Sequence, residues 1–315
     1  MRKPPAPLFR DPIYDGAADP TVIWNRHTKS WLLFYTQRRA NVDAPGVAYC
    51  HGCGIGIAES KDGGQTWVYL GNSEGLAFER GVNTFWAPEI IEHEGVYHMY
   101  CAYVRGCPSQ WVGDRHIHHY TSKDLFLWEH RSRLPLTSNK VIDACVFKMP
   151  TGQWRLWYKD EAYQSHTYAA DSTDLFNWKI VGPVITDCPH EGPNVFHWKG
   201  SYWMITDPWR GLKVYCSQDA ETWNPQAHIL ALPGHRPDDG YIAGHADVLV
   251  NEGRAFIFYF VHPGRSQDHR EVIEGVEPYA SRRSSIQVAE LELENGRIVC
   301  DRDKDFDFCL LAPRE

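Results

Sequence analysis

Short alternations of apolar and polar residues fill most of this chain, and they recur in groups of three. Each run is about 5–8 residues long and is bounded by Gly, Asn or Asp, which is typical of β-strands joined by tight turns. No stretch shows a helical period of useful length. The predicted strands span 19–24, 31–36 and 54–59, then 87–91, 96–104 and 116–121, then 142–148, 154–159 and 165–170, then 192–198, 201–206 and 212–216, and finally 245–250, 255–262 and 285–293.

A second repeat follows the first four of these groups. The motif Ser-x-Asp followed by Trp occurs four times, and its Asp side chain can close a turn by accepting backbone N–H groups. The Trp then begins a fourth strand, whereas the fifth group lacks the motif. The copies are Ser60-Lys61-Asp62 with Trp67, Ser122-Lys123-Asp124 with Trp128, Ser172-Thr173-Asp174 with Trp178, and Ser217-Gln218-Asp219 with Trp223.

Four-stranded units repeated about five times predict an all-β fold, a five-bladed β-propeller, with residues 1–315 forming a single domain. A stack of sandwich domains is the alternative. We favour the propeller because the units are too short to contain independent cores.

Composition and charge narrow the class of protein. Hydrophobic residues make up 43% and charged residues 23% of the chain, as in a soluble globular protein. The net charge of −8 argues against nucleic acid as a partner, and no apolar run approaches the ~18 residues that span a membrane. Residues 1–7 contain no apolar signal-peptide core, so we expect a cytoplasmic protein as the sequence stands, or a periplasmic or secreted one if a signal was removed. The nine Cys are irregularly spaced, and we expect reduced thiols.

Ionisable residues occur at the predicted starts of the innermost strands, which line the channel of a propeller. Asp19, Asp143 and Glu191 start the first, third and fourth units, and His245 starts the fifth. Each acid taken alone could be a turn or strand cap. A buried carboxylate is costly unless it is paired or functional, so the convergence of such groups on one channel mouth favours catalysis. Glycoside hydrolysis needs one protonated and one ionised carboxyl group, and crowding moves their pKa values apart.

The inner-strand motifs resemble, in their order along essentially the whole chain, the signatures of family 43 glycoside hydrolases and their relatives. The motifs are Asp19-Pro20, Trp86-Ala87-Pro88-Glu89, Ile142-Asp143-Ala144, Glu191-Gly192-Pro193, Gly244-His245 and Arg282-Arg283. The resemblance implies an inverting hydrolase with Asp19 as general base and Glu191 as general acid, about 6.5–9.5 Å apart. It implies that Asp143 tunes and orients the acid. It also implies that His245 lies at the channel centre, where family members often hold a hydrated calcium ion; no cofactor is predicted to be required.

Further residues are candidates for substrate binding. Trp86 is placed to stack on a sugar at the channel mouth, although simple core packing is the alternative. Glu89 is either a substrate contact or part of a structural ion pair. Arg282 and Arg283 are adjacent in a strand, so one of them at most faces the channel; Arg282 is the candidate for bonding a sugar hydroxyl or carboxylate.

A histidine-rich strand and an insertion depart from ordinary xylosidases and arabinanases. His116 and His118 share one face of a strand, where His118 is a candidate substrate contact or a polar packing residue. Zinc binding together with His98 or His166 is a lesser alternative. The insertion 37–53 is equally unusual. These departures leave a less common sugar open, such as an anhydrogalactose or a galactofuranose unit.

Rival functions follow from the same fold. The first hypothesis is an exo-acting hydrolase of a terminal sugar on an oligosaccharide or polysaccharide fragment, because loops 37–49 and 107–115 can wall off a pocket. A glycoside phosphorylase is the second, with Arg38, Arg39 or Arg105 binding phosphate. A non-catalytic sugar-binding propeller and a protein-interaction propeller are further alternatives. The sequence leaves the oligomeric state open.

Overall fold

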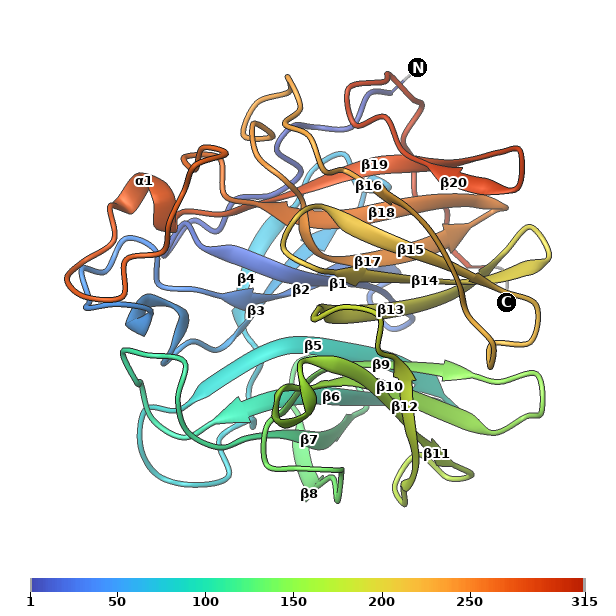
Figure 1. The fold of residues 1–315 in the computed structure, drawn as a ribbon, viewed down its shortest axis with the longest axis horizontal. Coiled ribbons are helices and arrows are strands. Elements are labelled where there is room, and N and C mark those ends of the chain that lie inside the picture. The colour runs from blue at the N-terminus through green and yellow to red at the C-terminus, as the bar shows by residue number, and fades with distance from the viewer. Residues whose placement is uncertain (1, 314–315) are drawn as a thin grey trace.

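The computed structural model describes residues 2–313, which form five antiparallel sheets of four strands each (Figure 1). Every sheet is built from strands that follow one another in the chain. The strands are β1 (Ala17–Asn25), β2 (Ser30–Gln37), β3 (Ile55–Ser60) and β4 (Val68–Asn72); β5 (Thr84–His93), β6 (Val96–Val104), β7 (Arg115–Ser122) and β8 (Glu129–Arg133); β9 (Val141–Lys148), β10 (Trp154–Asp160), β11 (His166–Ser172) and β12 (Lys179–Ile185); β13 (Glu191–Trp198), β14 (Ser201–Asp207), β15 (Leu212–Ser217) and β16 (Asn224–Ile229); and β17 (Gly244–Asn251), β18 (Arg254–Val261), β19 (Ser285–Glu294) and β20 (Arg297–Val299). The helical segments of the described residues are η1 (Ala48–Cys50), η2 (Glu161–Tyr163) and α1 (Tyr279–Arg282).

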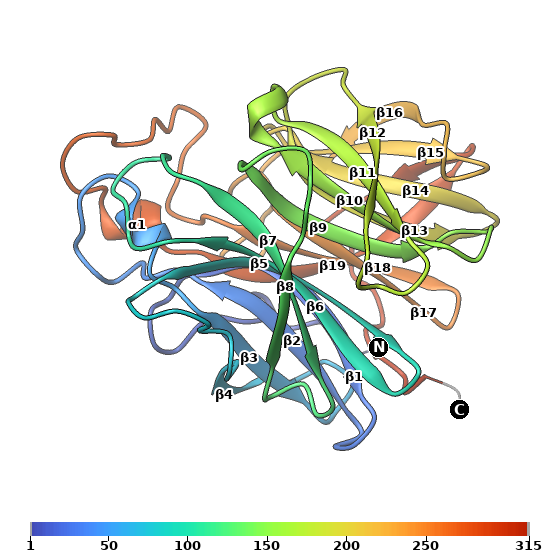
Figure 2. The ribbon, with the colours of Figure 1, turned by 90° about the horizontal axis from the view of Figure 1, so that it is seen from below.

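The first strand of each sheet lies at the centre of the molecule. Strands β1, β5, β9, β13 and β17 pack side by side in this order, and β17 packs against β1. The inner strands therefore form a closed ring from which the sheets fan outward as blades (Figure 2). This arrangement confirms the predicted five-bladed β-propeller. Among the helices of residues 2–313, none has the length and apolar character needed to span a bilayer.

The repeated Ser-x-Asp turn forms as predicted, and the copy after β7 shows how it works. Asp124 Oδ1 accepts the backbone N–H groups of Phe126 at 2.9 Å and Leu127 at 3.0 Å. Trp128 follows and is buried edge-on against Phe34 of the first blade, with ring centroids 6.3 Å apart. The motif therefore closes a hairpin and also supplies an apolar side chain that joins neighbouring blades.

The ring closes between the first and last blades without an exchange of strands, because β17–β20 are consecutive. The segment 306–310 covers this junction and contributes aromatic and aliphatic side chains to one cluster with β1, β2, β18 and β19. Phe308 is fully buried there and meets Phe256 edge-on, with centroids 5.4 Å apart. At the other end of the chain, the backbone of Phe9 pairs with that of Ile286. Both chain ends thus hold the junction together.

We expect Phe308→Ala to lower the free energy of unfolding by about 3–5 kcal/mol, since it leaves a cavity between the first and last blades. Urea denaturation followed by tryptophan fluorescence measures this change. Leu127→Ala is the control, because Leu127 is 60% exposed and its loss should change stability by less than about 0.5 kcal/mol. Equal, small effects for both variants would show that the C-terminal segment does not close the ring.

Candidate active site

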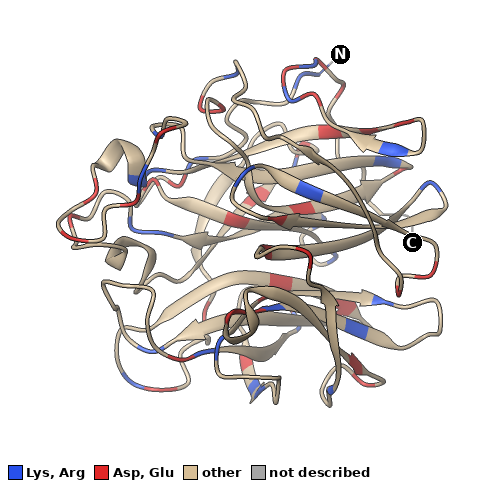
Figure 3. Cartoon of the chain, in the orientation of Figure 1, with Lys and Arg blue, Asp and Glu red and all other residues tan. Residues whose placement is uncertain are grey.

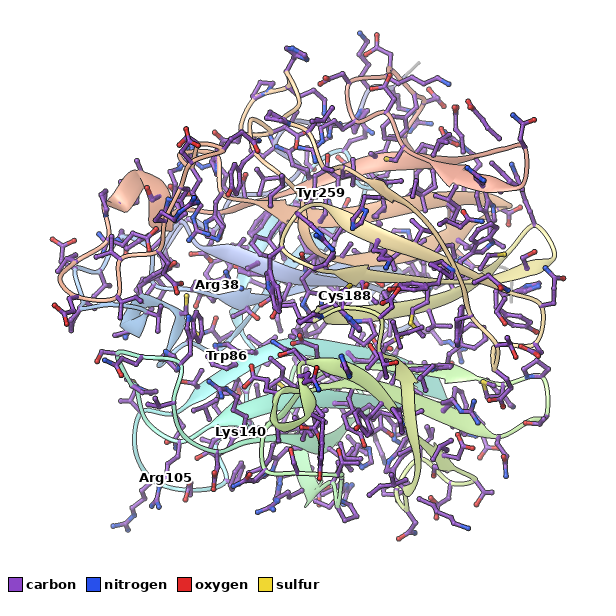
Figure 4. All side chains as sticks on the ribbon, viewed as in Figure 1. Arg38, Trp86, Arg105, Lys140, Cys188 and Tyr259 are labelled. Carbon is purple, nitrogen blue, oxygen red and sulfur yellow. The ribbon has the colours of Figure 1, made fainter. Side chains whose placement is uncertain are left out.

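A cavity of about 560 Å³ opens at one mouth of the inner ring, and all five blades contribute to its lining. The start of each inner strand reaches it. The residues at these starts are Asp19 on β1, Trp86 on β5, Asp143 on β9, Glu191 on β13 and His245 on β17. The structure therefore brings together the three predicted carboxyl groups, the predicted histidine and the predicted aromatic residue. Figure 4 labels Trp86 and Arg38, which lie on the side of the molecule where the long loops gather.

The backbone near these strand starts has a left-handed conformation in four of the blades. Asp19, Ala87, Asp143 and Gly192 all have positive φ, between 46° and 59°. A register irregularity accompanies the start of the inner strand in every blade. For a residue other than glycine this conformation costs of order 1–3 kcal/mol, and β-bulges of this kind re-aim side chains beside active sites. The bulge turns the first side chains of each inner strand toward the cavity.

Asp19 is held by cationic and aromatic neighbours. Arg38 Nη2 lies 3.2 Å and 3.3 Å from the two carboxylate oxygens of Asp19. The Arg38 guanidinium itself lies over the ring of Phe260, 4.8 Å from its centroid, and its Nη1 lies 3.5 Å from Nε2 of His262. His245 Nδ1 is 3.6 Å from Asp19 Oδ1. These contacts fix the orientation of a buried carboxyl group.

Asp143 lies between the histidine and the strand that carries Glu191. Its Oδ1 is 4.0 Å from His245 Nδ1, and its Oδ2 accepts the backbone N–H of Gly192 at 3.1 Å. Burial raises the pKa of Asp143 to about 6, even though the charge of His245 acts against this rise. Burial lowers the pKa of His245, but Asp143 and Asp19 outweigh it and leave this pKa above its ordinary value. The imidazolium form is therefore favoured between the two carboxyl groups.

Glu191 has an ammonium group as its direct partner. Lys159 Nζ lies 2.9 Å from Glu191 Oε2. Burial acts to raise the pKa of Glu191, but Lys159 outweighs burial, so that the pKa is lowered and the carboxylate form is favoured. Asp207 is the residue opposite Glu191 in the β13–β14 pair. Burial and the Glu191 charge raise the pKa of Asp207 to about 7. The two carboxyl groups thus favour different protonation states.

Lys159 and Asp207 are site residues that the sequence analysis did not predict. Their positions in the paired strands are a sequence signal that could have identified them. In an antiparallel hairpin, the end of the second strand lies opposite the start of the first. Lys159 lies near the end of β10 and Asp207 ends β14, and each pairs with a residue at the start of an inner strand. Ionisable residues at the ends of second strands are therefore candidates for the same site.

Three loops from blades one, two and five form a continuous wall on one side of the cavity. In Figure 1 they lie on the side marked by α1. The backbone of Val47, in the predicted insertion, donates to Ser109 at 3.0 Å, and Gly46 donates to Gly275 at 2.7 Å. Trp111 Nε1 donates to Glu271 Oε2 at 3.0 Å, which joins the loops of blades two and five. Both loops that were predicted to wall off a pocket reach this wall.

Three candidate substrate contacts lie outside the cavity lining, and their assignments need correction. Glu89 is directed between inner strands, where its Oε1 accepts the backbone N–H of Val146 at 2.7 Å. The bulge between Trp86 and Glu89 changes the strand alternation, which explains this outcome. Arg282 is buried in α1 and bonds Val42 and Asp43 instead of a ligand. His118 is the third case.

His118 lies in the third strand of blade two, and its Nδ1 is 2.9 Å from Nε2 of His130. His98 Nδ1 is likewise 2.9 Å from Nε2 of His119. Burial lowers the pKa of all four imidazoles, which favours their neutral forms. The polar packing interpretation fits these pairs, and among the described residues the suggested zinc set of His116 and His118 with either His98 or His166 does not form.

One other group in residues 2–313 has three possible metal-ligand atoms within 4.8 Å of one another, namely Asp187, Cys188 and His190. Figure 4 labels Cys188, which precedes β13. Asp187 already forms an ion pair with Lys213, and His190 Nε2 lies 2.6 Å from Thr167 Oγ1. These partners occupy the donor atoms that a metal would need.

The residues around His245 show whether a calcium ion could be bound directly at the site that the resemblance implies. Calcium takes about 6–8 oxygen ligands. Arg38 contacts both oxygens of Asp19, and the Nδ1 of His245 faces Asp19 and Asp143. His245 thus already lies against both carboxyl groups, and Arg38 contacts one of them. A calcium ion bound directly by Asp19 and Asp143 does not fit this arrangement.

Comparison with solved structures gives the class of fold. A thermostable family-43 glycoside hydrolase superposes with a TM-score of 0.65, at 17% sequence identity, over 98% of this chain and 99% of that one. A family-43 β-1,3-galactosidase with galactodeoxynojirimycin gives a TM-score of 0.70, at 14% identity, over 97% and 100% of the two chains. A family-43 β-xylosidase/α-arabinofuranosidase from a compost microbial metagenome, in complex with xylotriose and in a calcium-free form, gives 0.65 at 12% identity over 95% and 96%.

The fold is therefore that of the family-43 glycoside hydrolases, as the inner-strand motifs predicted. At this level of identity the likeness concerns the fold. No family model matches the sequence, and no curated protein matches it either.

The corrected position of Glu89 leads to a prediction about stability. Burial, with help from Asp247, raises the pKa of Glu89 from 4.5 to about 8. The stability that Glu89 contributes is therefore fully present below pH ~4.5 and is lost as the pH rises to about 8. We expect Glu89→Gln to become more stable relative to wild type between pH 5 and pH 8.5, since Gln keeps the acceptor for Val146 without the charge.

Urea denaturation at both pH values measures this change. Glu94→Gln is the matched control in the same hairpin, because the Glu94 side chain is 84% exposed. A difference between Glu89→Gln and wild type that stays constant across this pH range would contradict the assigned burial of an uncompensated carboxyl group.

Proposed function

We propose that this protein is an inverting, exo-acting glycoside hydrolase that releases a terminal sugar from an oligosaccharide or polysaccharide fragment, with furanosidic and anhydro sugars among the candidates. The convergence of Asp19, Asp143 and Glu191 from three blades on one cavity carries this proposal. The volume of about 560 Å³ is within the ordinary range for small-molecule sites. Trp86 in the lining offers an apolar face to a sugar ring.

In this mechanism Asp19 is the general base. Oriented by Arg38, it takes a proton from a water molecule whose oxygen attacks the anomeric carbon. Glu191 donates a proton to the glycosidic oxygen as the bond to the leaving group breaks. Asp143 positions the acid, because it accepts the backbone N–H of Gly192, the residue that follows Glu191. The released proton on Asp19 returns to solvent, and Glu191 is protonated again from solvent.

The joined loops support exo action. The wall formed by residues 46–47, 109–111 and 271–275 closes one side of the cavity, so a long polymer cannot pass through it in both directions. The neighbours in structure include a β-1,3-galactosidase and a β-xylosidase/α-arabinofuranosidase. We therefore propose that a terminal pentose or hexose unit occupies the cavity.

A glycoside phosphorylase is the second candidate, favoured by the position of Arg38 beside Asp19. The other two suggested phosphate ligands lie elsewhere. Arg39 donates to the backbone oxygens of His51 and Ala48, both at 2.8 Å. The Arg105 side chain is 80% exposed and faces Glu79. Water is therefore the preferred nucleophile in our proposal.

We expect Asp19→Asn and Glu191→Gln each to lower turnover of a natural disaccharide by at least ~10²-fold, since each removes one proton-transfer group. Release of sugar from a panel of disaccharides and aryl glycosides, with and without inorganic phosphate, measures this loss. NMR of the first product gives the anomeric configuration, which should be inverted. With an aryl glycoside whose leaving group needs no proton, Glu191→Gln should recover activity while Asp19→Asn should not.

Several outcomes would count against the proposal. Equal turnover by wild type and both variants would show that these carboxyl groups are not catalytic. Rate enhancement by phosphate with release of a sugar phosphate would establish the phosphorylase. Sugar binding on a glycan array without turnover of any substrate would establish a non-catalytic binding propeller.

We also propose that turnover requires no cofactor, since His245, Arg38 and Lys159 supply positive charge among the carboxyl groups of the cavity. Treatment with EDTA followed by gel filtration should leave kcat within about twofold of its starting value. A loss of activity that calcium restores would instead place a hydrated ion beside His245.

A further inference from the structure

Lys159 occupies an unusual place among the cavity residues. Its side chain is buried, yet its ammonium group contacts two carboxylates, Glu191 at 2.9 Å and Glu161 at 3.2 Å. The ammonium also lies 5.2 Å from the ring centroid of Trp209. Lys159 therefore has two further partners available if its bond to Glu191 breaks.

Glu161 is in turn held from its other side. Arg115 Nη1 lies 2.6 Å from Glu161 Oε2, and the Arg115 side chain is only 3% exposed. Glu161 starts η2, immediately after β10, and its backbone N–H donates to Lys140 at 2.9 Å. Both its backbone and its carboxylate are thus fixed. Glu161 is therefore a fixed acceptor beside the long side chain of Lys159.

The contact between Lys159 and Glu191 conflicts with the proposed role of Glu191 as the general acid. An acid must carry a proton when the glycosidic oxygen arrives. An ammonium group at 2.9 Å favours the Glu191 carboxylate, which has no proton to donate. Protonation of Glu191 therefore requires Lys159 to weaken or leave this contact.

Burial is the largest influence on the pKa of Glu191, and it acts in the opposite direction to Lys159. If Lys159 turns away, Glu191 stays in a buried site beside the carboxyl groups of Asp143 on β9 and Asp207 on β14. Like charges nearby favour the protonated form of an acid. Glu161 on η2 shares Lys159 with Glu191. The Trp209 hydrogen bond, the charge of His245 on β17 and the charge of Arg38 after β2 also favour the carboxylate, but each acts less strongly on Glu191 than Lys159 does.

We propose that Lys159 is a positioning residue for Glu191: it holds the Glu191 carboxylate in the free protein and moves onto Glu161 and the Trp209 ring when a leaving-group oxygen enters beside Glu191. This inference rests on the proposed function. Glu191 then takes a proton from solvent and passes it to the glycosidic oxygen as the carbon–oxygen bond breaks. Lysine suits this role because its long, flexible side chain carries three rotatable N–H donors.

Two variants should move the pH profile in opposite directions. The basic limb of kcat/KM reports the loss of the proton from the general acid of the free enzyme. Lys159→Met removes the cation, so this limb should move to higher pH by about 1 unit or more. Glu161→Gln removes the alternative partner and leaves Lys159 on Glu191, so the limb should move to lower pH and kcat should fall. Lys159→Arg should restore the position of the limb in part.

A control and a second substrate separate this role from a structural one. Lys140→Met replaces an exposed lysine that precedes β9, and it should leave the profile unchanged. On an aryl glycoside whose leaving group needs no proton, kcat of Glu161→Gln should approach that of wild type. Shifts of the basic limb in the same direction for Lys159→Met and Glu161→Gln, or no shift in either, would overturn the proposal.

A readout without turnover keeps this inference distinct from the proposed function. NMR titration of protein labelled with ¹³C at the glutamate carboxyl carbons follows Glu191 directly, and its signal is assigned by its absence in Glu191→Gln. The pKa of Glu191 should be higher in Lys159→Met than in wild type. An unchanged pKa would overturn the role of Lys159, whereas a raised pKa in a protein that cleaves no glycoside would disprove only the hydrolase.

Discussion

The burial of several carboxyl groups at one end of the inner ring is the constraint on which the rest of this site depends. Such groups cannot remain ionised in a low-dielectric environment without nearby positive charge or N–H donors. The structure supplies Arg38 to Asp19, Lys159 to Glu191, and two backbone N–H groups to Asp207. In Figure 3, acidic segments lie on strands in the middle of the molecule as well as on surface loops. The charges of the cavity therefore form one coupled set in which each group influences the protonation of its neighbours.

The propeller architecture produces this concentration of charge. Each blade contributes the start of its inner strand, and the repeated bulge directs a side chain from that start into the cavity. The partners come from the paired second strands, whose ends lie opposite these starts. Lys159 and Asp207 are placed in this way, and Arg38 directly follows β2. The same hairpin geometry that builds the blades thus supplies the neutralising groups Lys159 and Arg38 and also one further acid, Asp207.

The sequence predicts the blades and the inner-strand residues well, because both recur at equivalent points of a repeat. Asp19, Asp143, Glu191, His245 and Trp86 could be located in this way, and the structure places all of them around one cavity. The catalytic roles of the three acids stay predictions.

Other features depend on information that the repeat does not contain. A bulge between Trp86 and Glu89 decides which face of the strand carries Glu89. The alternation of residues along the strand does not reveal where this bulge lies. Lys159 and Asp207 depend on the register between paired strands, and the contact of Trp111 with Glu271 depends on how two long loops meet.

The unequal loops around the cavity give the proposed base and the proposed acid different surroundings. Asp19 belongs to blade one, on the side where the loops of blades one, two and five are joined above the cavity. Glu191 belongs to blade four, where the short connection 208–211 carries Trp209, which is 48% exposed. A general acid must face the leaving group, and a leaving group that continues into a longer chain needs an open path to solvent. The proposed acid, Glu191, therefore lies beside a short connection, whereas the proposed base, Asp19, lies on the side of the joined loops, where a water molecule and a terminal sugar could be enclosed together.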